Sequence, residues 1–66
     1  MTTYDYIMYD PEFKTFYYYF DDFEFGGWQT SSNPGDADSF DSPEEAIREC
    51  KEPGAVPVRR HIIIEV

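Results

Sequence analysis

The stretch of residues 16–28 constrains the fold of this chain more than any other, because it carries eight aromatic rings and three carboxylates in thirteen positions. In a β-strand, consecutive side chains point to opposite faces of the sheet. The even-numbered rings that begin with Phe16 therefore share one face, and the odd-numbered Tyr17 and Tyr19 share the other. We expect a helix to bury one of these faces and the other to remain a tyrosine surface with acids at its end.

A first strand and a turn precede this stretch. Residues 3–9 alternate between two faces, as a half-buried strand does. The sequence Asp-Pro-Glu-Phe at residues 10–13 suits a type I turn, with Asp at the first position and Pro at the second. A second strand is therefore predicted from about Lys14, paired back on the first as a hairpin.

The position of the second hairpin turn is left open by the sequence. Gly26-Gly27 is a strong turn signal, which would leave residues 28–31 as a short third strand. A turn at Asp21-Asp22 would instead make residues 23–28 the third strand.

The start of one helix is the best-marked boundary in the chain. Ser42 suits the N-cap and Pro43 the first helical position. Glu45 completes a Ser-x-x-Glu capping box, in which each end residue hydrogen-bonds the backbone of the other. A helix is therefore predicted from residue 43.

The inner face of this helix is predicted from its spacing. Ala46, Ile47 and Cys50 share one face, and we expect that face to lie on the sheet. Pro53-Gly54 predicts that the helix ends after residue 51 or 52.

Residues 57–66 predict the last strand, with Val58, Arg60 and Ile62 on one face. Residues 62–64, Ile-Ile-Ile, are apolar on both faces, which is typical of a central strand. The predicted fold class is α+β: an antiparallel three- to four-stranded sheet with one helix packed across it, in the order β-β-(β)-α-β. Residues 1–66 are expected to form a single domain, because a chain of this length has room for one core.

The charge of the chain is strongly negative and unevenly distributed. Five Lys or Arg against fourteen Asp or Glu give −9 at pH 7. Residues 1–45 hold eleven acids and one Lys, a balance of −10, whereas residues 46–66 hold three acids and four basic residues, a balance of +1. Charge of this sign repels nucleic acid and anionic membranes and favours basic partners. The competing explanation is solubility alone, because charge also keeps small proteins in solution.

A cytoplasmic protein is expected from the remaining composition. Cys50 is the only cysteine, so no internal disulfide can form, which fits a reducing compartment. Residues 1–20 contain Asp5, Asp10 and Glu12 and have neither a basic start nor a long apolar run, so no signal peptide is predicted.

No metal, cofactor or catalytic group is predicted. Four acids before and at the start of the helix are spaced in a way similar to calcium ligands: Asp36, Asp38, Asp41 and Glu44. Counted from the first of them, position 6 of the calcium loop lacks its glycine and position 12 is Ile47, which cannot bind a cation. No serine or cysteine nucleophile has a matching histidine motif, so we expect a non-enzymatic protein.

An acidic surface on a rigid aromatic sheet is suited to a basic groove on another protein, where carboxylates would stand in for phosphates. The partner-binding residues predicted are the acids around the aromatic strand, the loop and the first helical turn: Asp21, Asp22, Glu24, Asp36, Asp38, Asp41, Glu44 and Glu45. Asp5, Asp10 and Glu12 would extend this patch. We expect a monomer whose binding weakens steeply with salt and that does not bind nucleic acid or membrane directly.

Size, charge and layout together resemble the small phage-encoded anti-CRISPR proteins of the DNA-mimic kind, and among them an inhibitor of the type I-C surveillance complex. The stretches that carry the resemblance are Asp21-Asp22-Phe23-Glu24 and Asp36-Ala37-Asp38-Ser39-Phe40-Asp41. The resemblance implies an inhibitor that occupies the basic channel of a CRISPR effector complex in the host cytoplasm and blocks target DNA binding. This class has no shared motif, so the resemblance assigns no residue a role.

The alternative hypothesis is a small interaction or regulatory module. It would bind a protein partner through its aromatic sheet face or a sheet edge, or pair with a second copy of itself. Weak salt dependence and sensitivity to substitution of Tyr17 or Tyr19, rather than of acids, would distinguish it from the mimic.

Overall fold

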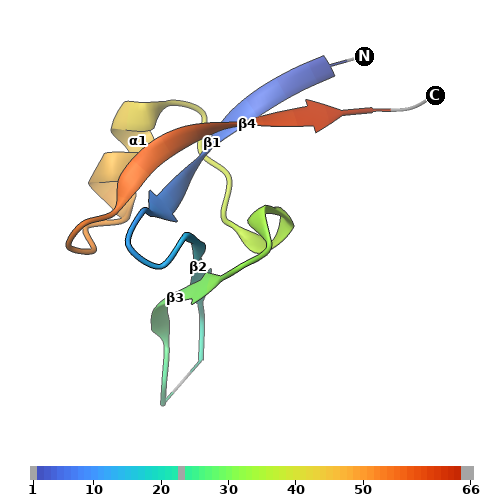
Figure 1. The fold of residues 1–66 in the computed structure, drawn as a ribbon. Coiled ribbons are helices and arrows are strands. Elements are labelled where there is room, and N and C mark those ends of the chain that lie inside the picture. The colour runs from blue at the N-terminus through green and yellow to red at the C-terminus, as the bar shows by residue number, and fades with distance from the viewer. Residues whose placement is uncertain (1, 23, 65–66) are drawn as a thin grey trace.

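The computed structural model describes residues 2–22 and 24–64. Its elements are β1 (Thr2–Asp10), β2 (Thr15–Phe20), β3 (Gly27–Ser31), the short 3₁₀ helix η1 (Pro34–Asp36), α1 (Pro43–Glu49) and β4 (Val56–Ile63) (Figure 1). The strands form one antiparallel sheet in the order β3-β2-β1-β4. The predicted α+β class is therefore confirmed, with four strands and one α-helix among the described residues.

The third strand of the second hairpin lies close to the predicted residues 28–31, but the turn is not confined to Gly26-Gly27. β2 ends at Phe20 and β3 begins at Gly27, so the connection occupies residues 21–26. Gly27 has a φ of +145°, a conformation that L side chains rarely adopt, so a glycine is suited to this point. The alternative strand over residues 23–28 begins at Phe23, which lies outside the described residues, and the pairing of β3 with β2 starts only at Gly27↔Phe20.

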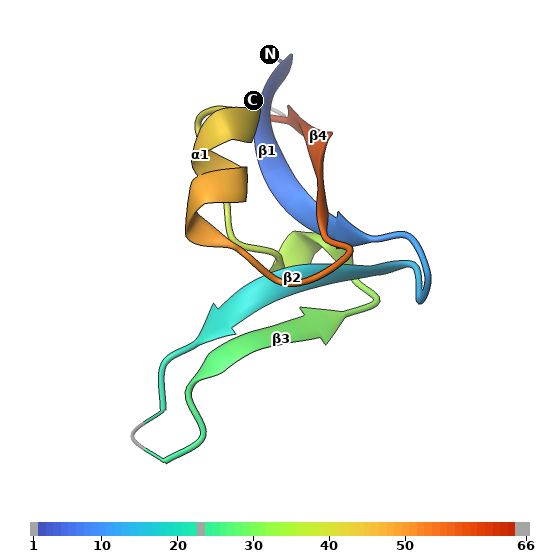
Figure 2. The same cartoon turned by 90° about the vertical axis from the view of Figure 1, so that its left-hand side faces the viewer.

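The sheet splits into two strand pairs that cross at an angle. β1 pairs with β4 along its length, from Thr2↔Ile63 to Tyr9↔Val56. β1 pairs with β2 only at its last two residues, Tyr9↔Phe16 and Asp10↔Thr15. The β2–β3 hairpin therefore leaves the β1–β4 pair and extends below it (Figure 2), which gives an elongated molecule of 40 × 23 × 21 Å.

Residues 37–40, which we call the wedge segment, fill the gap where β1 and β2 diverge. Phe40 exchanges two backbone hydrogen bonds with Tyr6 of β1, at 2.8 and 3.0 Å. Asp38 donates its backbone N–H to the carbonyl of Tyr17 in β2 at 3.3 Å. Its carboxylate accepts the N–H of Tyr19 at 2.8 Å. The wedge segment thus satisfies backbone groups of β2 that β1 does not pair, which buried or partly buried backbone requires.

The core lies between the sheet and α1. Its buried members are Met8, Tyr17, Phe40, Ala46 and Cys50. Tyr17 belongs to the odd-numbered face of β2, so that face is the one that α1 covers. The sequence leaves open which face the helix covers. Of the two tyrosines named for the alternative interaction module, Tyr17 is 8% exposed and Tyr19 is 53% exposed, so Tyr19 is the one that a partner can reach.

The start of α1 is confirmed and its end is earlier than predicted. Ser42 is the N-cap, and its hydroxyl accepts the N–H of Glu45 at 3.1 Å. The return bond of the capping box is shifted by one residue, because Glu45 accepts from the backbone of Asp41 at 3.2 Å. The helix ends at Glu49, with Cys50 as its C-cap, rather than at residue 51 or 52.

The predicted inner face of α1 is right for Ala46 and Cys50, which are 0% and 2% exposed, and wrong for Ile47, which is 53% exposed. Each residue turns the helix by about 100°. α1 has only two turns, so a narrow stripe of it packs on the sheet. Ala46 and the C-cap residue Cys50, four positions apart, form this stripe, and Ile47 lies beside it.

The alternation in β4 is confirmed. Val58, Arg60 and Ile62 are half-buried, whereas the residues between and after them, 59, 61 and 63, are exposed. The prediction of a central strand is wrong: β4 is an edge strand, and Ile63 is 73% exposed. β4 pairs with β1 along one edge, and among the described residues no strand pairs with its other edge. On its other side, β1 is paired with β2 and the wedge segment. Residues 65 and 66 lie outside the described residues.

A buried ion pair fastens the sheet face opposite α1. Asp5 and Arg60 are direct partners in the β1–β4 register. Arg60 donates from Nε and Nη2 to the two carboxylate oxygens of Asp5, at 3.0 and 2.6 Å. Its Nη1 donates to the carbonyls of Pro34 and Ala37, at 2.6 and 3.4 Å. Arg60 therefore ties η1 and the start of the wedge segment to the sheet.

Candidate protein-binding cleft

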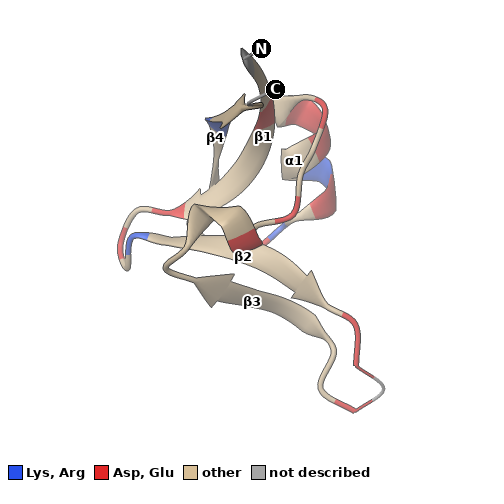
Figure 3. Ribbon diagram, turned by 90° about the vertical axis from the view of Figure 1, so that its right-hand side faces the viewer, with Lys and Arg blue, Asp and Glu red and all other residues tan. Residues whose placement is uncertain are grey.

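The predicted partner-binding acids occupy three places instead of one continuous patch (Figure 3). Asp21, Asp22 and Glu24 lie at the tip of the β2–β3 hairpin, and all three are exposed. Asp36 and Asp38 lie in η1 and the wedge segment. The remaining three lie just before and within the first turn of α1: Asp41, Glu44 and Glu45.

Asp5, Asp10 and Glu12 were predicted to extend the acidic patch. This is wrong for Asp5, and the positions of Asp10 and Glu12 do not support it. Asp5 is buried and paired with Arg60. Asp10 and Glu12 lie at the β1–β2 turn, whereas the acidic tip lies at the other end of the six-residue strand β2. At about 3.3 Å per residue, these two ends are roughly 20 Å apart. Asp10 is also used locally, because its carboxylate accepts the backbone N–H of Glu12 at 2.9 Å.

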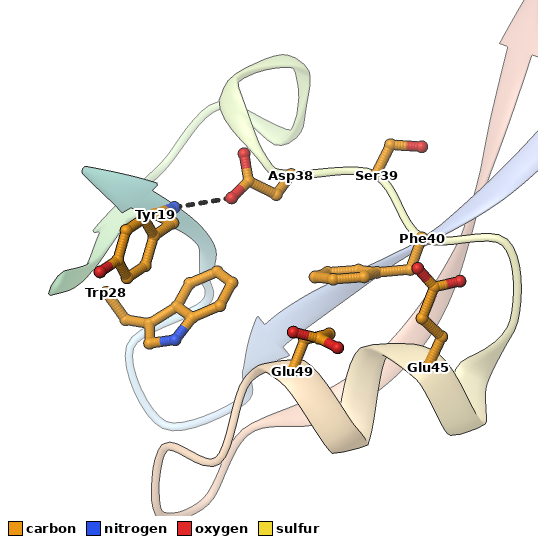
Figure 4. A pocket seen from close by; sticks show the side chains of 7 residues that line it. All are labelled: Tyr19, Trp28, Asp38, Ser39, Phe40, Glu45 and Glu49. Atoms are coloured by element: carbon orange, nitrogen blue, oxygen red, sulfur yellow. Dashed lines mark hydrogen bonds between the residues drawn. The ribbon is translucent and has the colours of Figure 1, made fainter. Parts of the chain in front are cut away.

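A cleft of about 520 Å³ lies between the β2–β3 hairpin and α1. Its seven lining residues, which define what we call the Trp28 cleft, are Tyr19, Trp28, Asp38, Ser39, Phe40, Glu45 and Glu49. Tyr19 and Trp28 stand on the hairpin side, Glu45 and Glu49 rise from the helix, and Phe40 lies between them (Figure 4). The volume is within the range of about 300–1,000 Å³ typical of ligand pockets.

The aromatic side of the cleft is a connected row of rings. Tyr19 and Trp28 are cross-strand partners in the β2–β3 register, and their ring centroids are 5.4 Å apart at an interplanar angle of 75°. Trp28 continues to Phe40 at 6.4 Å and 40°. Phe40 is anchored in the core, whereas Trp28 is half-buried and Tyr19 is 53% exposed. The row therefore has a fixed base and an accessible outer end.

The acidic side brings together two predicted residues and one that the sequence pattern did not indicate. Asp38 and Glu45 were predicted, and Glu49 was not. Glu45 and Glu49 are four residues apart on α1, so the i, i+4 spacing that places side chains on one helix face was the available signal. Glu49 also lies 3.6 Å from Arg48, in an ion pair whose side chains are 55% and 69% exposed.

Several predicted acids already hold local hydrogen bonds. Asp38 accepts from Tyr19, as described above. Asp22 accepts the backbone N–H of Glu24 at 3.0 Å, within the hairpin tip. Asp36 accepts from the hydroxyl of Ser31 at 2.7 Å, which ties η1 to β3. These bonds stabilise the loops that carry the acids, so these side chains serve the fold as well as the surface charge.

The pKa shifts of Asp5, Tyr17 and Cys50 follow from the packing of the fold. The hydrogen bond from Arg60 lowers the pKa of Asp5 below its ordinary value, against an opposing effect of burial. Burial raises the pKa of Tyr17 and of the Cys50 thiol. Cys50 is 2% exposed, which confirms the prediction that it belongs to the core. Within the described residues, no group of three or more His, Cys, Asp or Glu is placed to hold a metal ion.

Comparisons with other proteins add no further assignment: no family model, curated protein or solved structure matches this chain. In residues 2–22 and 24–64, no helix has the length and apolar character needed to cross a membrane.

Proposed function

We propose that this chain is a non-enzymatic inhibitor that binds a basic nucleic-acid-binding groove of a CRISPR effector complex and thereby blocks target DNA binding. The observation that carries the proposal is the excess of exposed carboxylates over exposed cations in the described part of the chain. The exposed acids there are Glu12, Asp21, Asp22, Glu24, Asp36, Asp41, Glu44 and Glu49. The exposed cations there are Lys14, Arg48, Lys51 and Arg59.

The length of the molecule supports the comparison with a duplex. Duplex DNA carries one charge per roughly 1.7 Å. Over the 40 Å long axis of this molecule, that spacing gives about 24 phosphates, of which about half face one partner. The exposed carboxylates are of the same order, although most are grouped at the hairpin tip, at η1 and at the start and end of α1, and Glu12 lies apart at the β1–β2 turn. A partner that contacts phosphates through Lys and Arg would meet negative charge at each of these places.

The direct test is competition for DNA on a purified type I-C surveillance complex. Target-duplex binding is measured by fluorescence anisotropy with increasing amounts of the chain. We expect the chain to displace the duplex, excess duplex to reverse the effect, and added salt to weaken it steeply. Retention of DNA at saturating chain, or inhibition that excess duplex does not reverse, would contradict the proposal.

Charge reversals at the hairpin tip test the mimicry within the same assay. Asp21 and Glu24 are exposed, and their carboxylates accept no hydrogen bond from the described residues, so Asp21→Lys/Glu24→Lys leaves the fold contacts intact. We expect the double variant to inhibit at least about tenfold less well, since like charges are placed against a basic groove. Glu12→Lys, at the far end of the hairpin, is the control and should cost much less per charge. Equal effects per charge would argue against a defined acidic binding face.

If the type I-C complex does not respond, pull-down from bacterial lysate with elution by short duplex DNA tests the wider class of partner. If DNA releases the captured protein, the result would support DNA mimicry, but with a target other than the type I-C complex. Prey that ignores DNA and salt but is lost on Tyr19→Ala would favour the interaction module.

A further inference from the structure

We propose that the Trp28 cleft is a binding site for an arginine side chain of the partner protein. The inference rests on the proposed function, because it names the group that this acidic protein takes from its basic partner. Two features of the cleft point to this ligand: its aromatic rings and its unused carboxylate oxygens.

The rings provide a surface on which a planar cation can stack. A guanidinium over an aromatic face is attracted by the ring quadrupole when it lies within about 6 Å of the centroid. Trp28, the strongest ring type for this interaction, stands nearly perpendicular to Tyr19, at 75°. Trp28 lies between Tyr19 and Phe40 in a row of three rings along the cleft (Figure 4). The same pairing already occurs elsewhere in the chain, where the guanidinium of Arg59 lies 4.9 Å from the ring centre of Tyr4.

The carboxylates supply acceptors that the described residues leave unused. Asp38 uses Oδ2 for the backbone N–H of Tyr19, which leaves Oδ1. Glu45 uses Oε2 for the backbone of Asp41, which leaves Oε1. Glu49 pairs with the exposed Arg48 at 3.6 Å, a weak surface pair that a better-placed cation can replace. An arginine has five N–H donors and no acceptor, which matches a cleft whose seven lining residues offer several free oxygens and include no cation.

Arginine suits this cleft better than lysine does. Its guanidinium is planar, is more weakly hydrated, stacks on aromatic rings and donates to carboxylates in a fork. A lysine ammonium is a compact, strongly hydrated charge that would have to choose between the rings and one acid. Arginine is also the residue that basic grooves use to grip phosphates bidentately, and it is enriched at binding hot spots. A mimic that captures such an arginine removes it from DNA.

The test uses Trp28 as its reporter, because it is the only tryptophan in the chain. The full chain is titrated with N-acetyl-arginine methylamide, and both fluorescence and the Trp28 indole N–H resonance are followed. The lysine and citrulline analogues are titrated at matched ionic strength. For one side chain, we expect saturation with a Kd of about 1–100 mM. The lysine analogue should bind at least about threefold more weakly, and neutral citrulline should give no saturable change.

Matched variants locate the site. Glu49→Gln and Glu44→Gln each remove one negative charge from α1, but only Glu49 lines the cleft. We expect Glu49→Gln to weaken arginine binding about threefold and Glu44→Gln to change it little. Tyr19→Leu removes a lining ring and should weaken binding similarly, whereas Phe13→Leu, at an exposed ring of the β1–β2 turn, should not. A heteronuclear spectrum of each variant is recorded alongside, to check that the variant stays folded.

Three results would overturn the inference: no saturable response to the arginine analogue, an equal response to citrulline or lysine, or equal behaviour of Glu49→Gln and Glu44→Gln. The proposed function stands apart from these results. If the chain displaces DNA from its target but its cleft ignores arginine, only the cleft assignment fails. If the cleft binds arginine but no DNA-binding complex responds, the proposed function fails and the cleft remains a site for arginine.

Discussion

Replacing Arg60 tests whether one buried ion pair holds the wedge segment in place. Arg60 gives four hydrogen bonds, two to the carboxylate of Asp5 and two to backbone carbonyls near the start of the wedge segment. The side chains of Arg60 and Asp5 are only 20% and 11% exposed. Among the described residues, Arg60→Ala would leave the Asp5 carboxylate buried with the hydroxyl of Ser39 as its remaining side-chain partner.

The expected cost is large relative to the stability of so small a protein. Removing one partner of a buried ion pair costs about 3–5 kcal/mol, and partial exposure places this pair near the lower limit, at about 3 kcal/mol. At about 0.05–0.15 kcal/mol per residue, a 66-residue chain has a free energy of unfolding of about 3–10 kcal/mol. Arg60→Ala is therefore expected to remove between a third and all of it.

Urea unfolding followed by circular dichroism and Trp28 fluorescence measures this loss. With an m-value of about 1 kcal/mol/M, a loss of about 3 kcal/mol lowers the urea midpoint by about 3 M. Arg59→Ala is the matched control, because the neighbouring Arg59 is exposed and, among the described residues, its side chain stacks on Tyr4 without a hydrogen bond or ion pair, for about 0.5–1 kcal/mol. If both variants cost the same, the ion pair does not hold the wedge segment and the reasoning is refuted.

The pH dependence provides a second readout with a defined sign. Because Arg60 lowers the pKa of Asp5 in the folded state, the stabilisation by Asp5 is fully present above the ordinary value of 3.8. It is lost as the pH falls through the lower folded-state pKa. The free-energy difference between the wild-type chain and Asp5→Asn should therefore be constant near neutral pH and shrink below about pH 4. A difference that stays constant to about pH 2 would contradict the assignment.

Three further experiments test local features. Ser42→Ala removes the N-cap hydroxyl of α1 and should cost about 1 kcal/mol in urea unfolding, whereas Ser42→Asp should restore most of it. Gly26→Ala would place a Cβ 2.7 Å from the carbonyl oxygen of Asp22, so amide spectra should show displacement at the hairpin tip; unchanged tip resonances would argue against this backbone path. Cys50 should react with thiol reagents only through opening of the fold, because it is 2% exposed and burial raises its pKa, and reaction as fast as that of a free peptide would be the contrary result.

The sequence predicts where the helix and the strands lie along the chain better than it predicts which of them pack or pair with one another. Local signals, such as the Ser42 cap and the strand pattern in residues 3–9, act over a few residues, and the structure has both the cap and the strand. The expectation that this strand is half-buried is wrong, because Ile7 and Met8, on its opposite faces, are both 1% exposed. β4 lies at the edge because β1, and no other strand of the described residues, pairs with it, and the order of strands in the sheet is decided between segments that are distant in the sequence. Apolar residues on both faces, as in residues 62–64, do not indicate this order.

The candidate site was predictable only in part for the same reason. Asp38 and Glu45 stood among the predicted acids, but nothing local indicated that the wedge segment would place Asp38 beside Tyr19 and opposite α1. The sequence alone does not show that Asp5 is buried, because its partner Arg60 is 55 residues away in the chain. Pairings over such separations follow from strand register, here Asp5↔Arg60, and register is fixed by the whole sheet.

The count of fourteen acids therefore overstates the number of carboxylates that a partner can use freely. Asp5 is neutralised by Arg60, and Asp10, Asp22, Asp36 and Asp38 each give an oxygen to a backbone or hydroxyl donor. A carboxylate that accepts such a bond keeps its charge but not its freedom to reorient toward an incoming cation. Mutations at these positions would change binding and stability together. Exposed acids such as Asp21, Glu24, Glu44 and Glu49 accept no hydrogen bond from the described residues, so substitutions there separate binding from folding.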